Sequence, residues 1–281
     1  MGRLEETQIT RAIIDAYHEE LSSRIVSDVV IVGAGPAGLM AAYDLAKSRR
    51  KVTLLEKRLS PGGGIWGGGM AMPKAVVQTG VLPLLDELGI HHSPAQEGLH
   101  TVGTIELAAG LCLSAVQAGA VLLNLMTVED VCIHSGRVDG IVANRSTISE
   151  TLPVDPITFS AKAVIDATGH EAAVVEVVRR RGLLPAPPNA RPFGEGPMDA
   201  AAGEAFVVDQ VAEPFPGLWI TGMSVCAALG GPRMGPIFGG MLLSGRRVAE
   251  RVLATIPAAR PPSRSLEGRA SHSPDSGVSV E

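Results

Sequence analysis

Three glycines with the spacing Gly33-x-Gly35-x-x-Gly38 follow an apolar run at 28–33 and open a helical pattern at 36–48. In a strand-turn-helix unit, the first glycine permits a tight turn and the second lets the backbone approach a pyrophosphate. The third lets the helix pack closely on the strand. The free N–H groups at the start of the helix then face the phosphates. The spacing therefore predicts a dinucleotide-binding turn.

Glu56 ends a second expected strand at 51–56, 18 residues after Gly38. A carboxylate at this point accepts hydrogen bonds from the ribose of adenosine. It also disfavours a 2′-phosphate, so we expect NAD or FAD rather than NADP. The spacing does not distinguish NAD from FAD.

A second glycine-rich segment, Pro-Gly-Gly-Gly-Ile-Trp-Gly-Gly-Gly at 61–69, has six glycines in nine residues. Such a composition disfavours both strand and helix. It fits either a flexible surface loop or a backbone that lies against a bound nucleotide or its product. Trp66 is equally consistent with a stacking or lid residue and with a hydrophobic anchor.

Asp155 and His170 are the best candidates for metal ligands. Asp155 lies in a loop, and His170 follows an expected strand at 162–166. An oxygen and a nitrogen ligand can hold a divalent metal and leave positions open for substrate. The alternative is a solvated aspartate and a capping histidine, and the spacing of 15 residues does not require the two to touch within one subunit.

Arg233 lies in the glycine- and proline-rich segment 230–240, before an expected helix at 237–255. A guanidinium in such a loop can hold a carboxylate through two parallel hydrogen bonds. The alternative is a solvated loop arginine. Cys226, just upstream, has no neighbouring histidine or cation in sequence, so we interpret it as a packed residue and not as a nucleophile.

The elements around these residues predict an α/β fold. Besides the βαβ unit at 28–56, which makes the sheet parallel, they indicate a hairpin of 126–133 and 137–144. We also expect helices at 4–22, 73–88 and 104–119, strands at 120–124 and 217–222, a loop at 183–204, and a glycine-rich loop between 222 and 237. The helix at 4–22 precedes the first strand, so we expect it on the outside or against another subunit. This layout resembles the Rossmann-like fold of the glutathione reductase type, with an added antiparallel hairpin layer.

Composition narrows the function further. The 281 residues are 46% hydrophobic and 19% charged, with a net charge of −5, which excludes global disorder and argues against nucleic acid as a partner. We expect no membrane span, because no apolar run reaches about 18 residues, and no secretory signal. Three scattered cysteines fit a reducing cytoplasm. We expect one domain over 1–257 and a disordered Pro/Ser-rich tail over 258–281.

Taken together, the motifs resemble the thiazole synthase family of thiamine biosynthesis, in its archaeal and bacterial branch. The likeness spans roughly residues 5 to 255. It rests on DVVIVGAGPAGLMAAYDLA, LLEKRLSPGGGIWGGGM, TVEDV, VDPITF, KAVIDATGHEA, PGLWITGM and GGPRMGPIFGGMLLSG. The resemblance implies that NAD is a substrate, with glycine and sulfide, and that the product is an ADP-linked thiazole carboxylate. It also implies a ring-like homo-octamer.

The resemblance also implies a role for individual residues. Asp155 and His170 match the ferrous iron ligands, contributed by two neighbouring subunits, and Arg233 matches the residue that binds the glycine carboxylate. The remaining matches surround the nucleotide or product: Ala37 in the pyrophosphate turn, Glu56 and Lys57 at the adenosine ribose, Gly64 at the nucleotide, Val128 beside the adenine, Met223 at the product, and Pro153 with Val154 next to the metal ligand.

The sulfur source is where the chain departs from the family pattern. Eukaryotic members carry a sacrificial cysteine two residues before the Asp-Pro pair, and sulfide-using members commonly carry histidine there. This chain has Pro153 at that position. The departure argues against a suicide mechanism and favours multi-turnover use of free sulfide with Fe(II), although the nearby acid–base group of the histidine is missing.

Two other functions remain open at this stage. The shared scaffold is compatible with an FAD-dependent oxidoreductase, although the chain is short for a flavoprotein with a full substrate domain. Pro153 also keeps open a diverged homologue that makes a different ADP-ribose adduct or only binds nucleotide.

Overall fold

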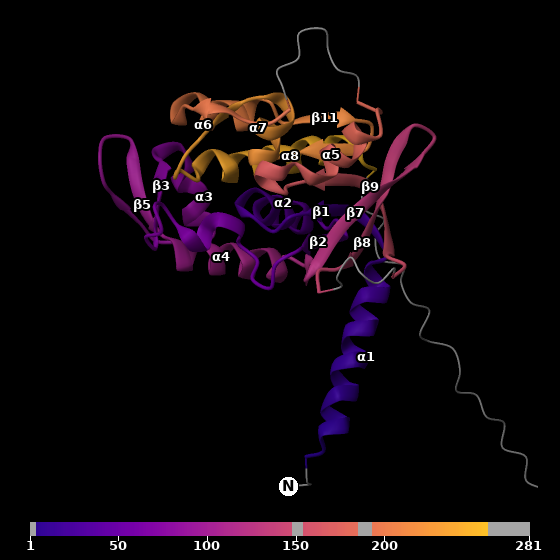
Figure 1. Cartoon of the computed structure of the whole chain (residues 1–281). Coiled ribbons are helices and arrows are strands. Elements are labelled where there is room, and N and C mark those ends of the chain that lie inside the picture. The colour runs from indigo at the N-terminus through magenta and orange to yellow at the C-terminus, as the bar shows by residue number, and fades with distance from the viewer. Residues whose placement is uncertain (1–3, 148–153, 185–192, 258–281) are drawn as a thin grey trace, which may run out of the picture.

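The computed structural model describes residues 4–147, 154–184 and 193–257, and its core is a mixed sheet (Figure 1). The strand order is β11 (Ala212–Phe215), β12 (Leu218–Ile220), β9 (Ile157–Asp166), β1 (Val26–Val32), β2 (Val52–Glu56) and β6 (Val121–Asn124). The strands from β12 to β6 are parallel, and β11 is an antiparallel edge strand. The fold is therefore the Rossmann-like α/β fold that the motifs predict.

The register brings the carboxyl ends of the parallel strands to one edge of the sheet. Val32 at the end of β1 pairs with Leu55 of β2 and with Asp166 of β9, and Asp166 pairs with Ile220 of β12. In open α/β sheets, ligands bind outside the carboxyl ends of the strands. This edge is therefore where a functional site is expected.

The expected hairpin is confirmed as β7 (Met126–His134) and β8 (Arg137–Arg145), which pair antiparallel. Ser135 and Gly136 both have positive φ at the turn, as a tight right-twisted hairpin requires. The amino-terminal half of β9 pairs with β8 and its carboxyl half with β1. Because of this double pairing, β9 is longer than the predicted strand at 162–166.

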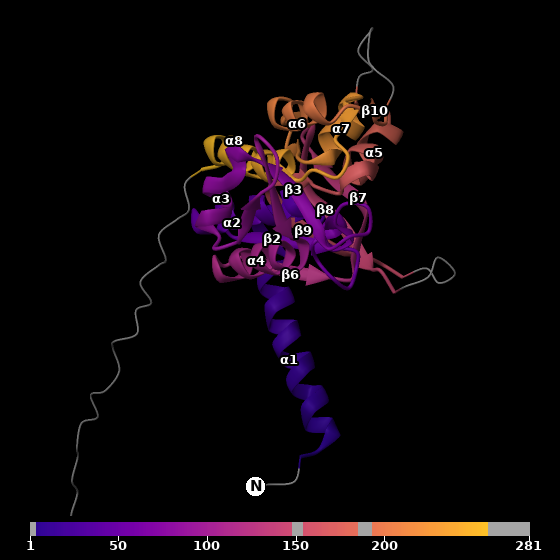
Figure 2. The ribbon, with the colours of Figure 1, turned by 90° about the vertical axis from the view of Figure 1, so that its left-hand side faces the viewer.

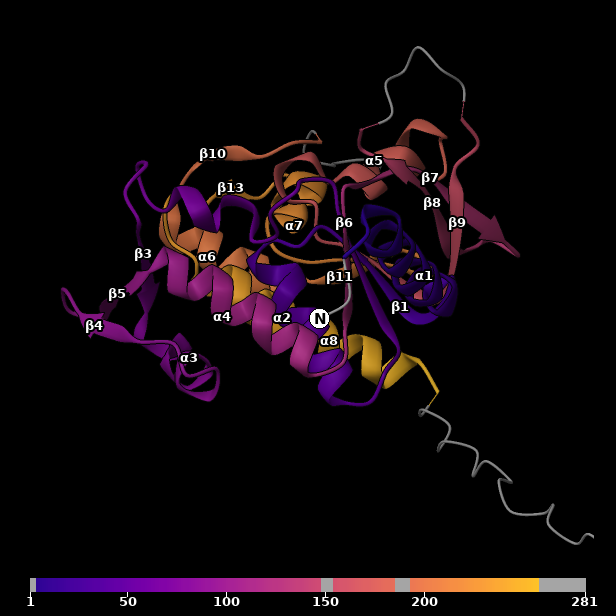
Figure 3. The ribbon, with the colours of Figure 1, turned by 90° about the horizontal axis from the view of Figure 1, so that it is seen from below.

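Helices complete the layers. α2 (Pro36–Lys47) lies side by side with α4 (Thr104–Gln117) and α8 (Gly239–Thr255) (Figure 3). α6 (Ala200–Asp209) packs on α8 and on α7 (Met223–Leu229), and α5 (Ala173–Arg180) packs on β7. Within the described ranges, no helix has the length and apolar character needed to cross a bilayer.

The amino-terminal helix α1 (Glu6–Arg24) extends away from the body of the molecule and has no buried residue (Figures 1 and 2). Its Ile9, Ile13 and Ile14 are exposed, so most of the helix projects from the body instead of packing on the outside of it. Contact of this helix with another subunit stays a prediction, as does the single-domain boundary at 257. The tail over 258–281 lies outside the described residues.

The expected helix over 73–88 is wrong. Lys74–Gln78 is a strand, β3, and only Leu82–Glu87 forms a helix, α3, after the short 3-10 turn η2 (Thr79–Val81). In β3, the buried Ala75 and Val77 alternate with more exposed neighbours, which is the periodicity of a half-buried strand. β3 pairs antiparallel with β5 (Leu99–Gly103), which also pairs with β4 (His92–Pro94). The partner residues of β3 therefore lie 21 to 29 positions downstream.

Two expected loops are also partly wrong. The region 183–204 contains the strand β10 (Gly196–Met198) and the start of α6, where Asp199 caps the helix by accepting a hydrogen bond from the backbone N–H of Ala202 at 3.0 Å. The loop expected after 222 contains α7, which ends at Leu229 and is capped by Gly230 with φ +69°. It is followed by the two-residue strand β13 (Pro232–Arg233), which pairs with β10.

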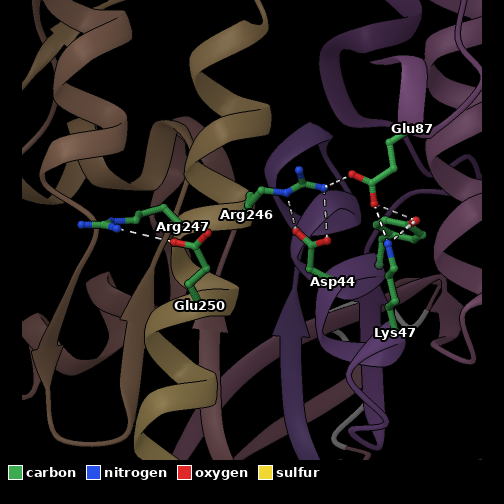
Figure 4. Close-up of polar contacts among 7 residues, drawn as sticks. Asp44, Lys47, Glu87, Arg246, Arg247 and Glu250 are labelled. Atoms are coloured by element: carbon green, nitrogen blue, oxygen red, sulfur yellow. Dashed lines mark hydrogen bonds and ion pairs between the residues drawn. The ribbon is translucent and has the colours of Figure 1, made fainter. Parts of the chain in front are cut away.

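A polar network ties α2, α3 and α8 together on the surface (Figure 4). Arg246 of α8 contacts Asp44 of α2 at 3.0 Å and Glu87 of α3 at 2.7 Å, and Glu87 also accepts from Lys47 at 2.7 Å. The hydrogen bond from Lys47, together with Arg246, lowers the pKa of Glu87 to about 2. Burial raises the pKa of Asp44.

Replacing Glu87 with glutamine removes its ion pairs with Lys47 and Arg246. The free energy of unfolding at neutral pH is expected to fall by only about 1 kcal/mol, because both pairs are partly exposed. A carboxyl with a lowered folded pKa stabilises above its unfolded pKa and loses that stabilisation as pH falls through the folded value. The difference from the parent protein is therefore expected to narrow from about pH 5 to about pH 2 in urea titrations. Glu250→Gln, which removes an exposed pair with Arg247 at 3.5 Å, is the control. An equal difference at every pH would contradict the prediction.

Candidate functional site

A cavity of about 510 Å³ opens at the carboxyl edge of the sheet. Its size is that of a site for a cofactor-sized ligand. Ten of the residues predicted from the sequence line it: Gly33, Gly35, Ala37, Glu56, Lys57, Gly64, Val128, His170, Met223 and Arg233. Gly38, Val154 and Asp155 do not, and Pro153 lies outside the described residues.

The glycine turn has the geometry that its spacing indicates. Gly33 has φ +101°, and a Cβ there would lie 2.5 Å from the carbonyl oxygen of Ala167. A Cβ on Gly38 would lie 2.0 Å from the carbonyl oxygen of Gly33, so the third glycine lets α2 pack on the strand. At Gly35, the cap of α2, a Cβ would meet no protein atom within 4 Å. The turn thus leaves space beside Gly35 and the helix start that a phosphate can occupy.

Glu56 anchors this turn. Its buried carboxylate accepts the backbone N–H of Ala34 at 2.9 Å on one oxygen and that of Arg58 at 2.8 Å on the other. A carboxylate has about four lone-pair positions, so two hydrogen bonds leave acceptor capacity for ribose hydroxyls. Lys57, the next residue, contacts both carboxylate oxygens of Glu171 at 2.7 Å.

The glycine-rich segment at 61–69 docks directly on the turn. The backbone N–H of Gly62 donates to the carbonyl oxygen of Ala34 at 2.7 Å, and a Cβ on Gly63 would lie 3.0 Å from Cα of Gly35. The segment includes a 3-10 turn, η1 (Gly63–Gly67). Trp66 donates its indole N–H to the carbonyl oxygen of Pro61 at 2.5 Å and is not among the residues that line the cavity. The side chain is 42% exposed, so the structure supports neither a stacking residue in the cavity nor a buried hydrophobic anchor.

A buried aspartate that the sequence analysis did not single out organises the segment around His170. Asp166 ends β9 and is fully buried. One of its oxygens accepts from the backbone N–H and the hydroxyl of Thr168 and from Ser224, at 2.7–3.0 Å. The other accepts from the first turn of α5, at 2.9 and 3.0 Å. This carboxylate thereby holds the 3-10 turn η3 (Gly169–Glu171), which carries His170, against the sheet edge.

Glu195 is the second residue that sequence reasoning missed. Nδ1 of His170 contacts one of its carboxylate oxygens, and Nε of Arg233 lies 3.3 Å from the other. The glutamate side chain is 10% exposed, whereas those of His170 and Arg233 are 61% and 56% exposed. The structure therefore joins the predicted metal ligand and the predicted carboxylate binder through one buried carboxylate.

Asp155 is not brought to this site within one chain. It lies exposed just before β9, and His170 lies just after the carboxyl end of that strand. Ten strand residues at about 3.3 Å each place the two ends roughly 30 Å apart along the strand. In the described part of the chain, no three histidine, cysteine or acidic side chains cluster as a metal site would need. One copy thus offers its two candidate ligands at different places.

The three cysteines have the character of packed residues. Burial raises the pKa of Cys226 to about 12 and that of Cys112 to about 11, and it also raises the pKa of Cys132. All three lie in the described ranges, and none lines the cavity. A raised pKa keeps a thiol protonated and poorly nucleophilic.

The model of the Thi4 family matches residues 10–238. The chain belongs to the Thi4 family. A "Thiamine thiazole synthase" of Thermococcus kodakarensis is 48% identical over 251 residues, covering 89% of this chain and 98% of the relative. The protein of that name from Thermotoga maritima is 46% identical over 250 residues, covering 89% and 97%.

A solved structure agrees with this membership. The crystal structure of Thermovibrio ammonificans THI4 superposes with a TM-score of 0.85 at 41% identity, covering 90% of this chain and 98% of that one. The Thi4 match spans the glycine turn, the segment 61–69 and Arg233, which contribute to the cavity wall. It also spans Asp166 and Glu195, which contact residues of that wall. The described cavity therefore belongs to the shared part of the family fold.

Proposed function

We propose that the chain is a thiazole synthase of thiamine biosynthesis, which converts NAD, glycine and sulfide into an ADP-linked thiazole carboxylate and releases nicotinamide. The observation that carries this proposal is the shared cavity, into which the dinucleotide turn, His170 and Arg233 all open. Relatives at 46–48% identity bear the name "Thiamine thiazole synthase".

The nucleotide half of the cavity holds the ADP portion of NAD. The start of α2 beside Gly35 faces the pyrophosphate with free N–H groups. Glu56, already fixed by two backbone hydrogen bonds, accepts from the adenosine ribose, and a 2′-phosphate would meet its negative charge. Val128 beside the adenine and Met223 at the product line the same cavity. NAD is therefore the dinucleotide substrate in this proposal.

The other half of the cavity holds glycine. After loss of nicotinamide, the ADP-ribose carbonyl condenses with the glycine amine, and Arg233 holds the carboxylate through two charge-assisted hydrogen bonds. Its side chain is exposed and lines the cavity, which supports this contact. Sulfur addition, cyclisation and dehydration complete the thiazole.

Fe(II) is the metal in this proposal. A carboxylate and an imidazole suit Fe(II) and leave positions for substrate. The contact of His170 Nδ1 with Glu195 leaves the other ring nitrogen as a ligand. Because Asp155 lies at the far end of β9, it reaches a metal on His170 only from a second copy. When bound, Fe(II) supplies a common point for sulfide and the glycine-derived group.

The shared site requires an assembly, and we propose the homo-octamer that the family resemblance implies. The sulfur donor in the proposal is free sulfide, used over many turnovers. The raised thiol pKa of the three cysteines, none of which lines the cavity, supports an external donor.

Mass spectrometry of small molecules released from anaerobically purified protein tests the proposed function. ADP-thiazole carboxylate, or the imine of glycine and ADP-ribose, is the expected result. FAD in place of these compounds would contradict the proposal and favour an oxidoreductase. Intact NAD that gives no product when Fe(II), glycine and sulfide are added would favour a diverged nucleotide-binding homologue.

A further inference from the structure

Glu195 lies behind the cavity wall on a rigid backbone. The N–H of Gly194 donates to the carbonyl oxygen of Ala227 at 2.8 Å, and that of Gly196 donates to Gly231 at 2.7 Å. β10, which begins at Gly196, then pairs in parallel with β13, which ends at Arg233. Glu195 is not among the residues that line the cavity, so it is placed to act through its neighbours and not on a ligand.

The two oxygens of this carboxylate serve two partners that line the cavity. His170 comes from η3 after β9, and Arg233 comes from β13. Their side chains contact different oxygens of Glu195. A side chain with 10% exposure and two contacts has little freedom to move, so it fixes His170 and Arg233 relative to each other.

The chemistry of each contact selects one state of the partner. A carboxylate accepts hydrogen bonds, so Nδ1 of His170 is the donor in this contact and Nε2 is the nitrogen left for a metal. On Arg233, the contact occupies Nε and leaves the two terminal nitrogens, which form the edge that binds a carboxylate through parallel hydrogen bonds.

We propose that Glu195 is a positioning residue that holds the metal-binding nitrogen of His170 and the carboxylate-binding edge of Arg233 in one arrangement. The proposal rests on the function proposed above. It predicts that loss of the Glu195 carboxylate weakens metal binding and glycine use together, while NAD binding through the distant Glu56 side of the cavity is retained.

The test is a titration of the metal-free protein with Co(II), a spectroscopic substitute for Fe(II), followed by visible absorption. Glu195→Ala and the isosteric Glu195→Gln are expected to bind Co(II) about 10- to 100-fold more weakly, which is the usual cost of losing the partner of a histidine ligand. Both are also expected to need more glycine for half-maximal rate. Formate added to Glu195→Ala should restore part of the Co(II) affinity by replacing the lost carboxylate.

Two controls separate this role from general damage. NAD affinity, measured by calorimetry, reports whether each variant is folded. Glu250→Gln, which alters an exposed carboxylate on α8, should leave Co(II) binding unchanged. Unchanged Co(II) affinity in both Glu195 variants, with a parent protein that binds Co(II) through His170, would overturn the positioning role alone. A parent protein that binds no Co(II), or binds it equally well after His170→Ala, would contradict the proposed metal site and this inference with it.

Discussion

Asp155→Ala is expected to lower thiazole formation more than about 100-fold, because loss of a direct ligand exceeds the cost of losing a ligand's partner. NAD affinity is expected to stay unchanged, since Asp155 is not among the residues that line the cavity. The rate is measured anaerobically with NAD, glycine, Fe(II) and sulfide, and NAD affinity by calorimetry. Asp139→Ala, at a half-exposed pair with His134 in the hairpin, is the control and should keep full activity.

The position of Asp155 makes a stronger form of this experiment possible. Asp155 and His170 lie at opposite ends of β9, so a metal held by both belongs to two copies. Asp155→Ala and His170→Ala are each expected to be inactive. After the two are dissociated, mixed in equal amounts and reassembled, about one quarter of the shared sites have both ligands intact. Activity should therefore return to about that fraction of the parent value.

Two outcomes would contradict the shared metal site. Full activity of Asp155→Ala with Fe(II) and sulfide would show that this carboxylate is not a required ligand. If both single variants bind NAD and assemble together but the mixture stays inactive, the two residues do not complete one another across copies. His170 would then need a different partner.

The parts of the site that the sequence predicts well are those whose signals are local. Gly33, Gly35 and Gly38 act on the turn and helix in which they lie, and Glu56 ends the neighbouring strand of the same βαβ unit. The family resemblance then indicates Arg233 and His170, but not what holds them. For that, the order of strands in the sheet and their register are needed.

Asp166 and Glu195 show why the rest is not predictable from the sequence alone. In the sequence, Asp166 is only the last residue of an expected strand. Its role in holding the segment around His170 depends on a hydrogen bond from Ser224, 58 residues away. Glu195 lies in a glycine- and proline-rich region that predicts only a loop, and its role depends on the pairing of β10 with β13. A three-residue strand paired with a two-residue strand has no periodicity to detect. Buried carboxylates of this kind are found only once the long-range contacts are known.

Arg233→Ala is expected to raise the glycine concentration needed for half-maximal rate by about 10- to 100-fold, which corresponds to the loss of a charge-assisted hydrogen-bonded pair. NAD affinity is expected to change by less than about 3-fold, because in the proposed function Glu56 and the start of α2 bind the nucleotide without Arg233. Steady-state rates at varied glycine and calorimetric titration with NAD measure the two effects separately.

A conservative variant and a matched control make this prediction more specific. Arg233→Lys keeps the positive charge but lacks the planar edge that binds a carboxylate through two bonds, so it should recover only part of the glycine affinity. Arg247→Ala, which removes an exposed pair with Glu250 on α8, is the matched control. Equal losses for glycine and NAD in Arg233→Ala would mean that this arginine holds the nucleotide or the fold of the cavity wall. A loss of glycine affinity without a loss of NAD affinity would support a glycine site between Arg233 and the metal-binding nitrogen of His170. This is the arrangement that Glu195, which contacts both side chains, is proposed to maintain.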